Sequence, residues 1–158
     1  MILVIGEALI DLIGRGGQSY EAVVGGANAN VALALAVRGE KQAFLGRISD
    51  DGFGRLIRNH LASHGVNLDL AISASEQTSL AVATINQEGV ANYSFYLNGT
   101  ADWGWTPQEL PSIDAIEQLD AKAIQFGCLG MAIEPGSSVI LNWSKQVSTA
   151  NLLTLSHD

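Results

Sequence analysis

The sequence predicts an α/β protein with three layers, in which helices cover both faces of a mainly parallel sheet. Apolar strand-like runs alternate with helix-like runs along the whole chain, which is the pattern of parallel sheets. Hydrophobic residues make up 47% of the 158 residues, which is enough to form a core. No internal repeat or long linker divides the chain, so its length suits one domain.

The expected elements follow one another in a regular order. Strand-like runs occupy residues 2–5, 43–45, 80–85, 93–97, 123–126 and 152–155. Helix-like runs occupy residues 28–38, 52–64, 112–119 and 136–147. The segment 32–37 alternates Ala with Leu or Val, which also fits a strand, but its alanine content and the following Arg38-Gly39 favour a helix.

The helix expected at 52–64 has clear start and stop signals. Phe53, Leu56, Ile57 and Leu61 have helical spacing and form an apolar stripe, and Gly65 is a natural stop. Asp50 and Asp51 precede it, and we expect both to cap its positive end. The stretch from Gly46 to Gly54 is therefore interpreted as a turn, a cap and a helix. It is not interpreted as a phosphate-binding loop, because two aspartates would repel phosphate.

Composition excludes several classes of function. The net charge of −8 argues against nonspecific binding to nucleic acid or to an anionic membrane. The single cysteine, Cys128, rules out an intrachain disulfide and is expected to be small and buried. Glu7 and Asp11 interrupt the apolar N-terminus, so we expect a cytoplasmic protein without a signal peptide. His60 and His64 lie one helical turn apart but lack a third ligand, so no metal site is expected.

One hairpin stands outside the layered pattern. The run from 80 to 97 turns at Glu88-Gly89, and its second strand is apolar on both faces because it carries Tyr93, Phe95, Tyr96 and Leu97. A two-stranded hairpin cannot bury three aromatic rings. We therefore expect an exposed apolar sheet that associates with a second copy of the chain.

The most informative stretch is Gly25-Gly26-Ala27-Asn28-Ala29-Asn30. Two glycines allow close approach of backbone or ligand, and two asparagines at a helix start can face a polar ligand. Upstream, Asp11 is expected to end the first buried strand, where its carboxylate could accept hydrogen bonds from adjacent sugar hydroxyls. Asn30 could both donate to and accept from a hydroxyl. The alternative for each residue is a structural role in a turn or a cap.

These blocks, followed by Gly46 to Gly54 and by Thr100-Ala101-Asp102-Trp103, resemble the N-terminal half of the ribokinase-like (PfkB) carbohydrate kinases, the fructokinase type most closely. The resemblance covers the whole chain and implies a ribokinase-like fold. In that fold, a small β lid at about 14–24 and 78–100 closes over the sugar. It implies substrate binding by Asp11, Gly25, Gly26, Asn30 and Tyr96.

The resemblance also implies ATP and Mg²⁺ as cofactors and phosphorylation of a small sugar or sugar acid, of the fructose or 2-keto-3-deoxygluconate type. The family's nucleotide half, with a Gly-Ala-Gly-Asp segment that holds the catalytic base, has no counterpart here. We therefore expect this chain to supply the sugar clamp and lid, to bind no cofactor and to be inactive alone. Two alternatives remain: a noncatalytic sugar-binding or dimerising module, and an unrelated nucleotide-binding α/β protein. The latter would need a glycine-rich turn directly after the first strand.

Overall fold

The core of the molecule is a parallel four-stranded sheet. The structure, a computed structural model, describes residues 1–16, 18–86, 88–148 and 153–157. The sheet has the order β10-β9-β1-β4, and all its neighbouring strands run parallel. Its strands are β1 (Ile2–Ile5), β4 (Gln42–Leu45), β9 (Ala123–Gly127) and β10 (Leu153–His157).

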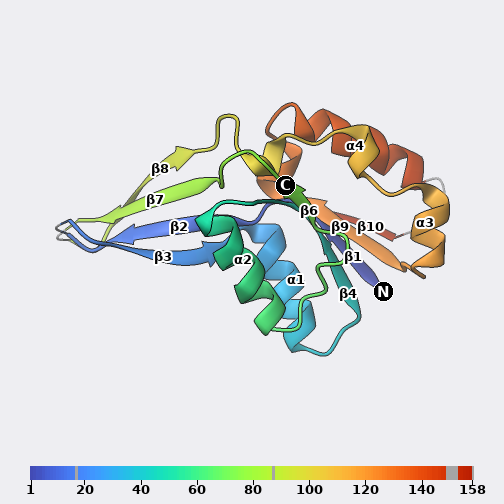
Figure 1. Cartoon of the computed structure of the whole chain (residues 1–158), viewed down its shortest axis with the longest axis horizontal. Coiled ribbons are helices and arrows are strands. Elements are labelled where there is room, and N and C mark those ends of the chain that lie inside the picture. The colour runs from blue at the N-terminus through green and yellow to red at the C-terminus, as the bar shows by residue number, and fades with distance from the viewer. Residues whose placement is uncertain (17, 87, 149–152, 158) are drawn as a thin grey trace.

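Helices cover both faces of this sheet. Figure 1 shows α1 (Ala27–Val37) and α2 (Gly52–Ser63) on one side, and α3 (Ile113–Gln118) and α4 (Gly136–Ser148) on the other. Because successive strand residues point to opposite faces, β1 divides its side chains between two apolar clusters. Leu3 and Ile5 pack with α3 and α4, while Val4 packs with α1 and α2.

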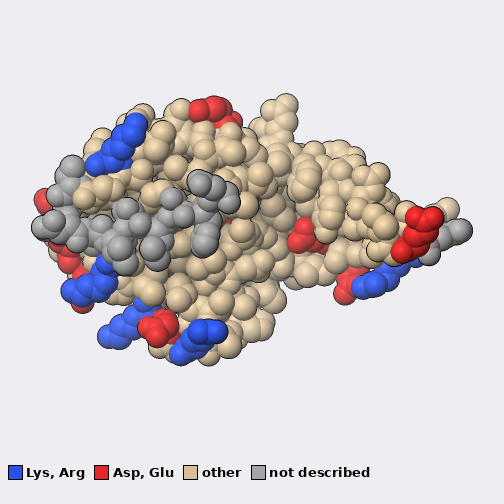
Figure 2. Space-filling view, turned by 180° about the vertical axis from the view of Figure 1, so that it is seen from behind, with Lys and Arg blue, Asp and Glu red and all other residues tan. Residues whose placement is uncertain are grey.

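A second sheet projects from this core and is called the lid here. It has the order β3-β2-β7-β8 and consists of β2 (Leu9–Gly14), β3 (Tyr20–Gly25), β7 (Leu80–Ile85) and β8 (Ala91–Tyr96). Strands β2 and β7 are parallel, and each has an antiparallel outer neighbour. In the space-filling view the lid extends from the body as an arm (Figure 2).

The first buried strand ends earlier than the sequence suggested. The chain leaves β1 at Gly6, whose φ is 151°, and a Cβ there would overlap the Asn28 side chain. Glycine therefore permits both the bend and the close contact. Asp11 was expected at the end of the core strand, but it lies within β2 of the lid.

The short elements were the hardest to predict. Two three-residue strands, β5 (Arg47–Ser49) and β6 (Ile72–Ala74), pair in parallel and were not foreseen. The described residues also form three short 3-10 helices: η1 (Ala101–Trp103), η2 (Pro107–Glu109) and η3 (Cys128–Met131). The expected helices and the longer strands are present with small shifts of their ends, while residue 152 of the last expected strand lies outside the described residues.

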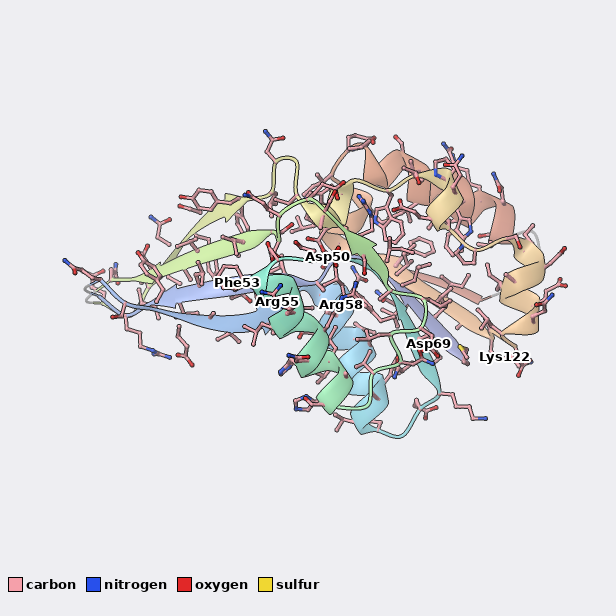
Figure 3. The ribbon with its side chains drawn as sticks, viewed as in Figure 1. Asp50, Phe53, Arg55, Arg58, Asp69 and Lys122 are labelled. Carbon is pink, nitrogen blue, oxygen red and sulfur yellow. The ribbon has the colours of Figure 1, made fainter. Side chains whose placement is uncertain are left out.

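The base of the lid rests on the second apolar cluster. Phe53 lies at the start of α2 beside the lid (Figure 3), and it packs on the same cluster as Leu12, Val24 and Leu80 of the lid strands. Beyond this base the outer strand β8 is exposed along its whole length. Tyr93, Phe95 and Tyr96 are 53%, 57% and 61% exposed, which confirms the predicted apolar surface.

The three tryptophans and the single cysteine differ in burial. Trp103, Trp105 and Trp143 are all buried and belong to the packing of the body. Cys128 was expected to be buried, but it is exposed, with a positive φ of 55° at the turn after β9.

Among the described residues, no helix combines the length and the apolar character needed to cross a membrane.

Candidate functional site

The candidate site lies where the lid meets the body, around the carboxylate of Asp11. Asp11 stands opposite Val23 on β3 and Ala81 on β7, and Ala81 in turn stands opposite Phe95 on β8. Paired residues of adjacent strands point to the same face of a sheet, so these side chains share one face of the lid. Within the described part of the chain, no hydrogen bond or ion pair holds the Asp11 carboxylate.

Burial shapes the chemistry of this carboxylate. Asp11 is partly buried, and the loss of surrounding water raises its pKa above the ordinary aspartate value. An acceptor without a partner among the described residues is available to a ligand, and hydroxyl groups would supply the donors. Asp11 therefore has the geometry and the free bonding capacity of a ligand-binding residue.

The two glycines at positions 25 and 26 serve different purposes. Gly25 lies beside Asp11, and a Cβ at Gly25 would collide with the Oδ2 atom of Asp11. Gly26 has a φ of 103°, and a Cβ there would lie 2.7 Å from the carbonyl oxygen of Glu7. The first glycine thus leaves room for the carboxylate, and the second allows the chain to turn from β3 into α1.

Asn28 does not face a ligand, contrary to what its position at the helix start suggested. It is buried, and its Nδ2 donates to Glu7 Oε2 at 2.8 Å and to the carbonyl oxygen of Gly127 at 3.1 Å. Glu7 Oε1 also accepts from the backbone N–H of Ala27 at 2.8 Å. A buried carboxylate thus caps the start of α1 and fixes it against the turn after β9.

Asn30 is placed differently from Asn28. It lies in the first turn of α1, is exposed, and donates its backbone N–H to the carbonyl of Gly26 at 2.9 Å. Its side chain has no hydrogen-bond partner among the described residues. Both the NH₂ donor and the carbonyl acceptor of the Asn30 side chain are therefore available to a ligand. Along the chain, Asn30 lies one helical turn after Gly26.

Tyr96 lies apart from the other candidate residues. It stands opposite Leu80, which stands opposite Ile10, so Tyr96 shares the lid face that packs towards the body. Asp11 lies on the other face, together with Phe95 and Tyr93, whose rings stack with centroids 5.9 Å apart. The structure therefore does not bring Tyr96 to Asp11, and it offers Phe95 instead. The alternation of side chains along β8 is the signal that could have distinguished the two.

Asp102 is a buried carboxylate that sequence reasoning did not assign to any role. It lies in η1 directly after the lid, is 2% exposed, and accepts the backbone N–H of Ala8 at 2.8 Å. Burial, and to a lesser extent the negative charge of Glu7, raise the pKa of Asp102 to about 7. Hydrogen bonds from Ser79 and Ala8 oppose this rise.

The start of α2 offers no phosphate cradle. Asp51 is the N-cap and accepts from the N–H of Gly54 at 2.8 Å and from the N–H of Thr78 at 2.9 Å. Its own burial would raise its pKa, but these hydrogen bonds lower it below the ordinary value. Asp50 was expected to cap the helix as well, but among the described residues only its backbone carbonyl bonds the helix, through Arg55. A carboxylate thus occupies the helix start, which disfavours a bound anion.

No metal centre is evident either. Within the described residues, no group of three or more His, Cys, Asp or Glu side chains could hold a metal ion. The described part of the chain thus provides a candidate site for hydroxyl groups, while the start of α2 offers no phosphate cradle and no cluster of metal ligands is found.

Comparison with known sequences matches this arrangement to one family. The profile of the pfkB family carbohydrate kinases matches residues 1–129. A fructokinase of Solanum tuberosum is 35% identical over 166 residues, which covers 100% of this chain and 51% of that protein. A fructokinase of Klebsiella pneumoniae is 33% identical over 138 residues, which covers 87% of this chain and 43% of that protein. The chain thus spans about half the length of these relatives.

Solved structures agree. A fructokinase from Xylella fastidiosa with bound ATP is 27% identical, with a TM-score of 0.88, and the match covers 98% of this chain and 50% of that one. An uncharacterised sugar kinase from Pyrococcus horikoshii in complex with ATP has a TM-score of 0.86 and covers 99% of this chain and 52% of that one. At 24% identity the second likeness concerns the fold alone. Together these matches confirm the predicted three-layer fold with its β lid.

Proposed function

Because the chain belongs to the pfkB family of carbohydrate kinases, we propose that it is the sugar-binding part of an ATP-dependent kinase that phosphorylates a hydroxyl of a small sugar or sugar acid. Membership of this family excludes the alternative of an unrelated nucleotide-binding protein. The observation that carries the proposal is the partly buried Asp11 carboxylate, which has no partner among the described residues and lies beside Gly25 on the lid face that it shares with Phe95.

Asp11 and Asn30 would hold the sugar by its hydroxyl groups. An ionised carboxylate accepts hydrogen bonds from two neighbouring hydroxyls, and bonds to a charged acceptor are stronger than neutral ones. Asn30 would add a donor and an acceptor, while Gly25 and Gly26 let the sugar approach the backbone closely. Phe95 and Tyr93, on the same lid face as Asp11, would cover the sugar and exclude water.

Within this reaction, the chain's contribution would be positioning. Phosphoryl transfer depends on holding the acceptor hydroxyl in line and on stabilising charge at the phosphoryl group. The start of α2 does not fit a triphosphate, because the Asp51 carboxylate fills it, and no cluster that could hold a metal ion is present among the described residues. We therefore derive no step through ATP or Mg²⁺. Both cofactors are proposed for a longer protein that includes the remainder of the family's length.

Because the chain would supply positioning but would not bind ATP, we expect it to have no kinase activity alone. This activity can be measured directly. Purified chain, mixed with ATP, Mg²⁺ and a panel of sugars, should give no phosphorylation in a coupled assay. Turnover that rises linearly with the concentration of the chain would show that its own residues suffice for catalysis.

The proposed substrate is fructose, with 2-keto-3-deoxygluconate as the second choice. The relatives at 33% and 35% identity are named fructokinases, and both sugars present adjacent hydroxyls to a carboxylate. A noncatalytic sugar-binding or dimerising module is the alternative function, favoured by the exposed rings of Tyr93, Phe95 and Tyr96. Both functions share the sugar site, and only phosphorylation by the longer protein separates them.

Sugar binding by the chain itself tests the proposal. Titration with fructose, followed by NMR of the backbone amides, should perturb the amides around Gly25 and Asp11. Asp11→Asn keeps the size of the side chain but removes its charge, and it should weaken binding about tenfold or more. Asp69→Asn, at an exposed aspartate away from the lid (Figure 3), is the matched control and should leave binding unchanged. Equal binding by the Asp11→Asn variant would place the sugar elsewhere.

A further inference from the structure

Asp102 ties both ends of the lid hairpin to the body. Its Oδ2 lies 2.5 Å from the hydroxyl oxygen of Ser79, the residue directly before β7. Ser79 in turn lies 2.6 Å from the hydroxyl of Thr100, which follows β8. Thr100 contacts the carbonyl oxygen of Leu97 at 2.9 Å and so closes the turn that leaves the lid. Four oxygen atoms therefore form one chain of three hydrogen-bonded contacts, buried at the base of the lid.

The number of hydrogen atoms decides how this chain is bonded. Three contacts between oxygen atoms require three hydrogens, one for each contact. The hydroxyls of Ser79 and Thr100 supply one each, and the carbonyl of Leu97 supplies none. If Asp102 were ionised, one contact at 2.9 Å or less would place lone pairs against each other. In the ionised form Ser79 donates to Asp102 and Thr100 donates to Leu97, which leaves the contact between Ser79 and Thr100 without a hydrogen. A proton on Asp102 reverses the first bond and completes the chain, so that Asp102 donates to Ser79, Ser79 to Thr100, and Thr100 to Leu97.

The charged groups around Asp102 favour this proton. Glu7, from the segment between β1 and β2, is buried nearby, and within the described residues its oxygens accept only from N–H donors. Arg47 of β5 donates to the carbonyl of Ala101 and pairs with Glu76 and Glu109, so its charge is already matched. On α4, which also packs against η1, the one ionisable side chain is the exposed Lys145. The raised pKa of Asp102 agrees with these surroundings.

We propose that Asp102 holds the proton that completes this chain, and that it is thereby a positioning residue for the lid hairpin formed by β7 and β8. A carboxyl group whose pKa is raised by folding stabilises the folded state when it is protonated. The contribution of Asp102 to the stability of the lid base is therefore full at low pH. It is lost as the pH rises through about 7. One contact of the chain then has no hydrogen, and the base of the hairpin loosens. The effect of losing the Asp102 proton on the order of the lid does not depend on the proposed function. Its effect on sugar affinity rests on that function.

Hydrogen exchange of the lid amides tests this inference on the chain as it is. Protection factors for Leu80–Ile85 and Ala91–Tyr96, corrected for the intrinsic effect of pH on exchange, should fall about fivefold between pH 6 and 8.5, which corresponds to one lost hydrogen bond. Asp102→Asn supplies a neutral donor to Ser79 and an acceptor to Ala8 at every pH. Its lid protection should therefore be high and independent of pH, whereas Asp69→Asn should behave like the parent.

A direct titration covers the case in which the variant does not fold. The ¹³C resonance of the Asp102 carboxyl, assigned through the backbone in the unmodified chain, should titrate near neutral pH. Titration in the ordinary aspartate range would overturn the proposal, as would lid protection that does not change with pH in the parent. Fructose binding is measured separately. A lid that responds to pH in a chain that never binds sugar would refute the proposed function and leave this inference intact.

Discussion

The carboxylate of Asp11 occupies the space into which any side chain at Gly25 would project. The two residues come from adjacent antiparallel strands, β2 and β3, where Gly25 stands opposite Leu9 and Asp11 opposite Val23. The contact explains why a glycine is needed at this position even though its φ is not positive. It also means that the carboxylate can be displaced without changing Asp11 itself.

Gly25→Ala should therefore remove sugar binding while the fold survives. The added methyl group would turn the Asp11 carboxylate away, because the end of a side chain moves more easily than the backbone. We expect fructose affinity to fall about tenfold or more, as for Asp11→Asn. NMR titration with fructose measures it. Gly52→Ala is the control, since a Cβ there meets only Arg55 Nη2 at 3.8 Å. Unchanged affinity in the Gly25→Ala variant would separate Asp11 from the sugar site.

Sugar affinity should depend on pH through Asp11. Burial raises the pKa of Asp11, and the ionised form is the one that accepts two hydroxyls, so affinity should be full above this raised pKa and below the pH of about 7 at which the base of the lid loosens. It should fall as the pH drops through that value, at a higher pH than for an ordinary aspartate. Binding titrations between pH 4 and 8, on the order of the range in which carboxylates with raised pKa values titrate, would show the change. Asp11→Asn should be weak and should lack this decline.

Asp51→Ala should destabilise the chain, because one carboxylate caps α2 and bonds the segment before β7. Asp51 accepts from the N–H of Gly54 and from both the N–H and the hydroxyl of Thr78. Losing these bonds should lower the free energy of unfolding by about 1–3 kcal/mol. Urea denaturation measures this. Asp50→Ala removes a neighbouring carboxylate, labelled in Figure 3, that accepts no hydrogen bond within the described residues. A similar loss in both variants would mean that general charge, rather than the cap, matters.

The lid should drive self-association. Strands β3 and β8 are the outer strands of the lid, and the rings of Tyr93, Phe95 and Tyr96 are more than half exposed. Burying such a surface against a second copy is favourable, and open sheet edges promote pairing. Light scattering should find a dimer or larger species. Replacing Phe95 and Tyr96 with serine should weaken it at least several-fold. A parent chain that stays monomeric at high concentration would contradict the prediction.

Most elements of the fold could be predicted from local sequence, because their signals lie within a few residues. Helical spacing of Phe53, Ile57 and Leu61 and the stop at Gly65 set the limits of α2 to within one residue. The turn at Glu88-Gly89 indicated the lid hairpin, and Gly89 has the positive φ of 80° that such a turn needs. The alternation of strand-like and helix-like runs along the chain likewise predicted the layered sheet.

What only the tertiary structure decided depends on partners far apart in the chain. Asn28 looked like a ligand-binding residue until Glu7, 21 residues earlier, was seen to occupy its amide. Asp102 gained its role from Ala8, 94 residues away, and from a burial that no local pattern reveals. Phe95 and Tyr96 are neighbours with the same aromatic character, and alternation along β8 places them on opposite faces of the lid, but only the register of β8 against β7 and β2 decides which of them shares the face of Asp11. Local sequence determines which elements form, because propensity and capping act within one turn or one strand. The site depends on how strands pair and which carboxylates are buried, and those are properties of contacts between distant segments.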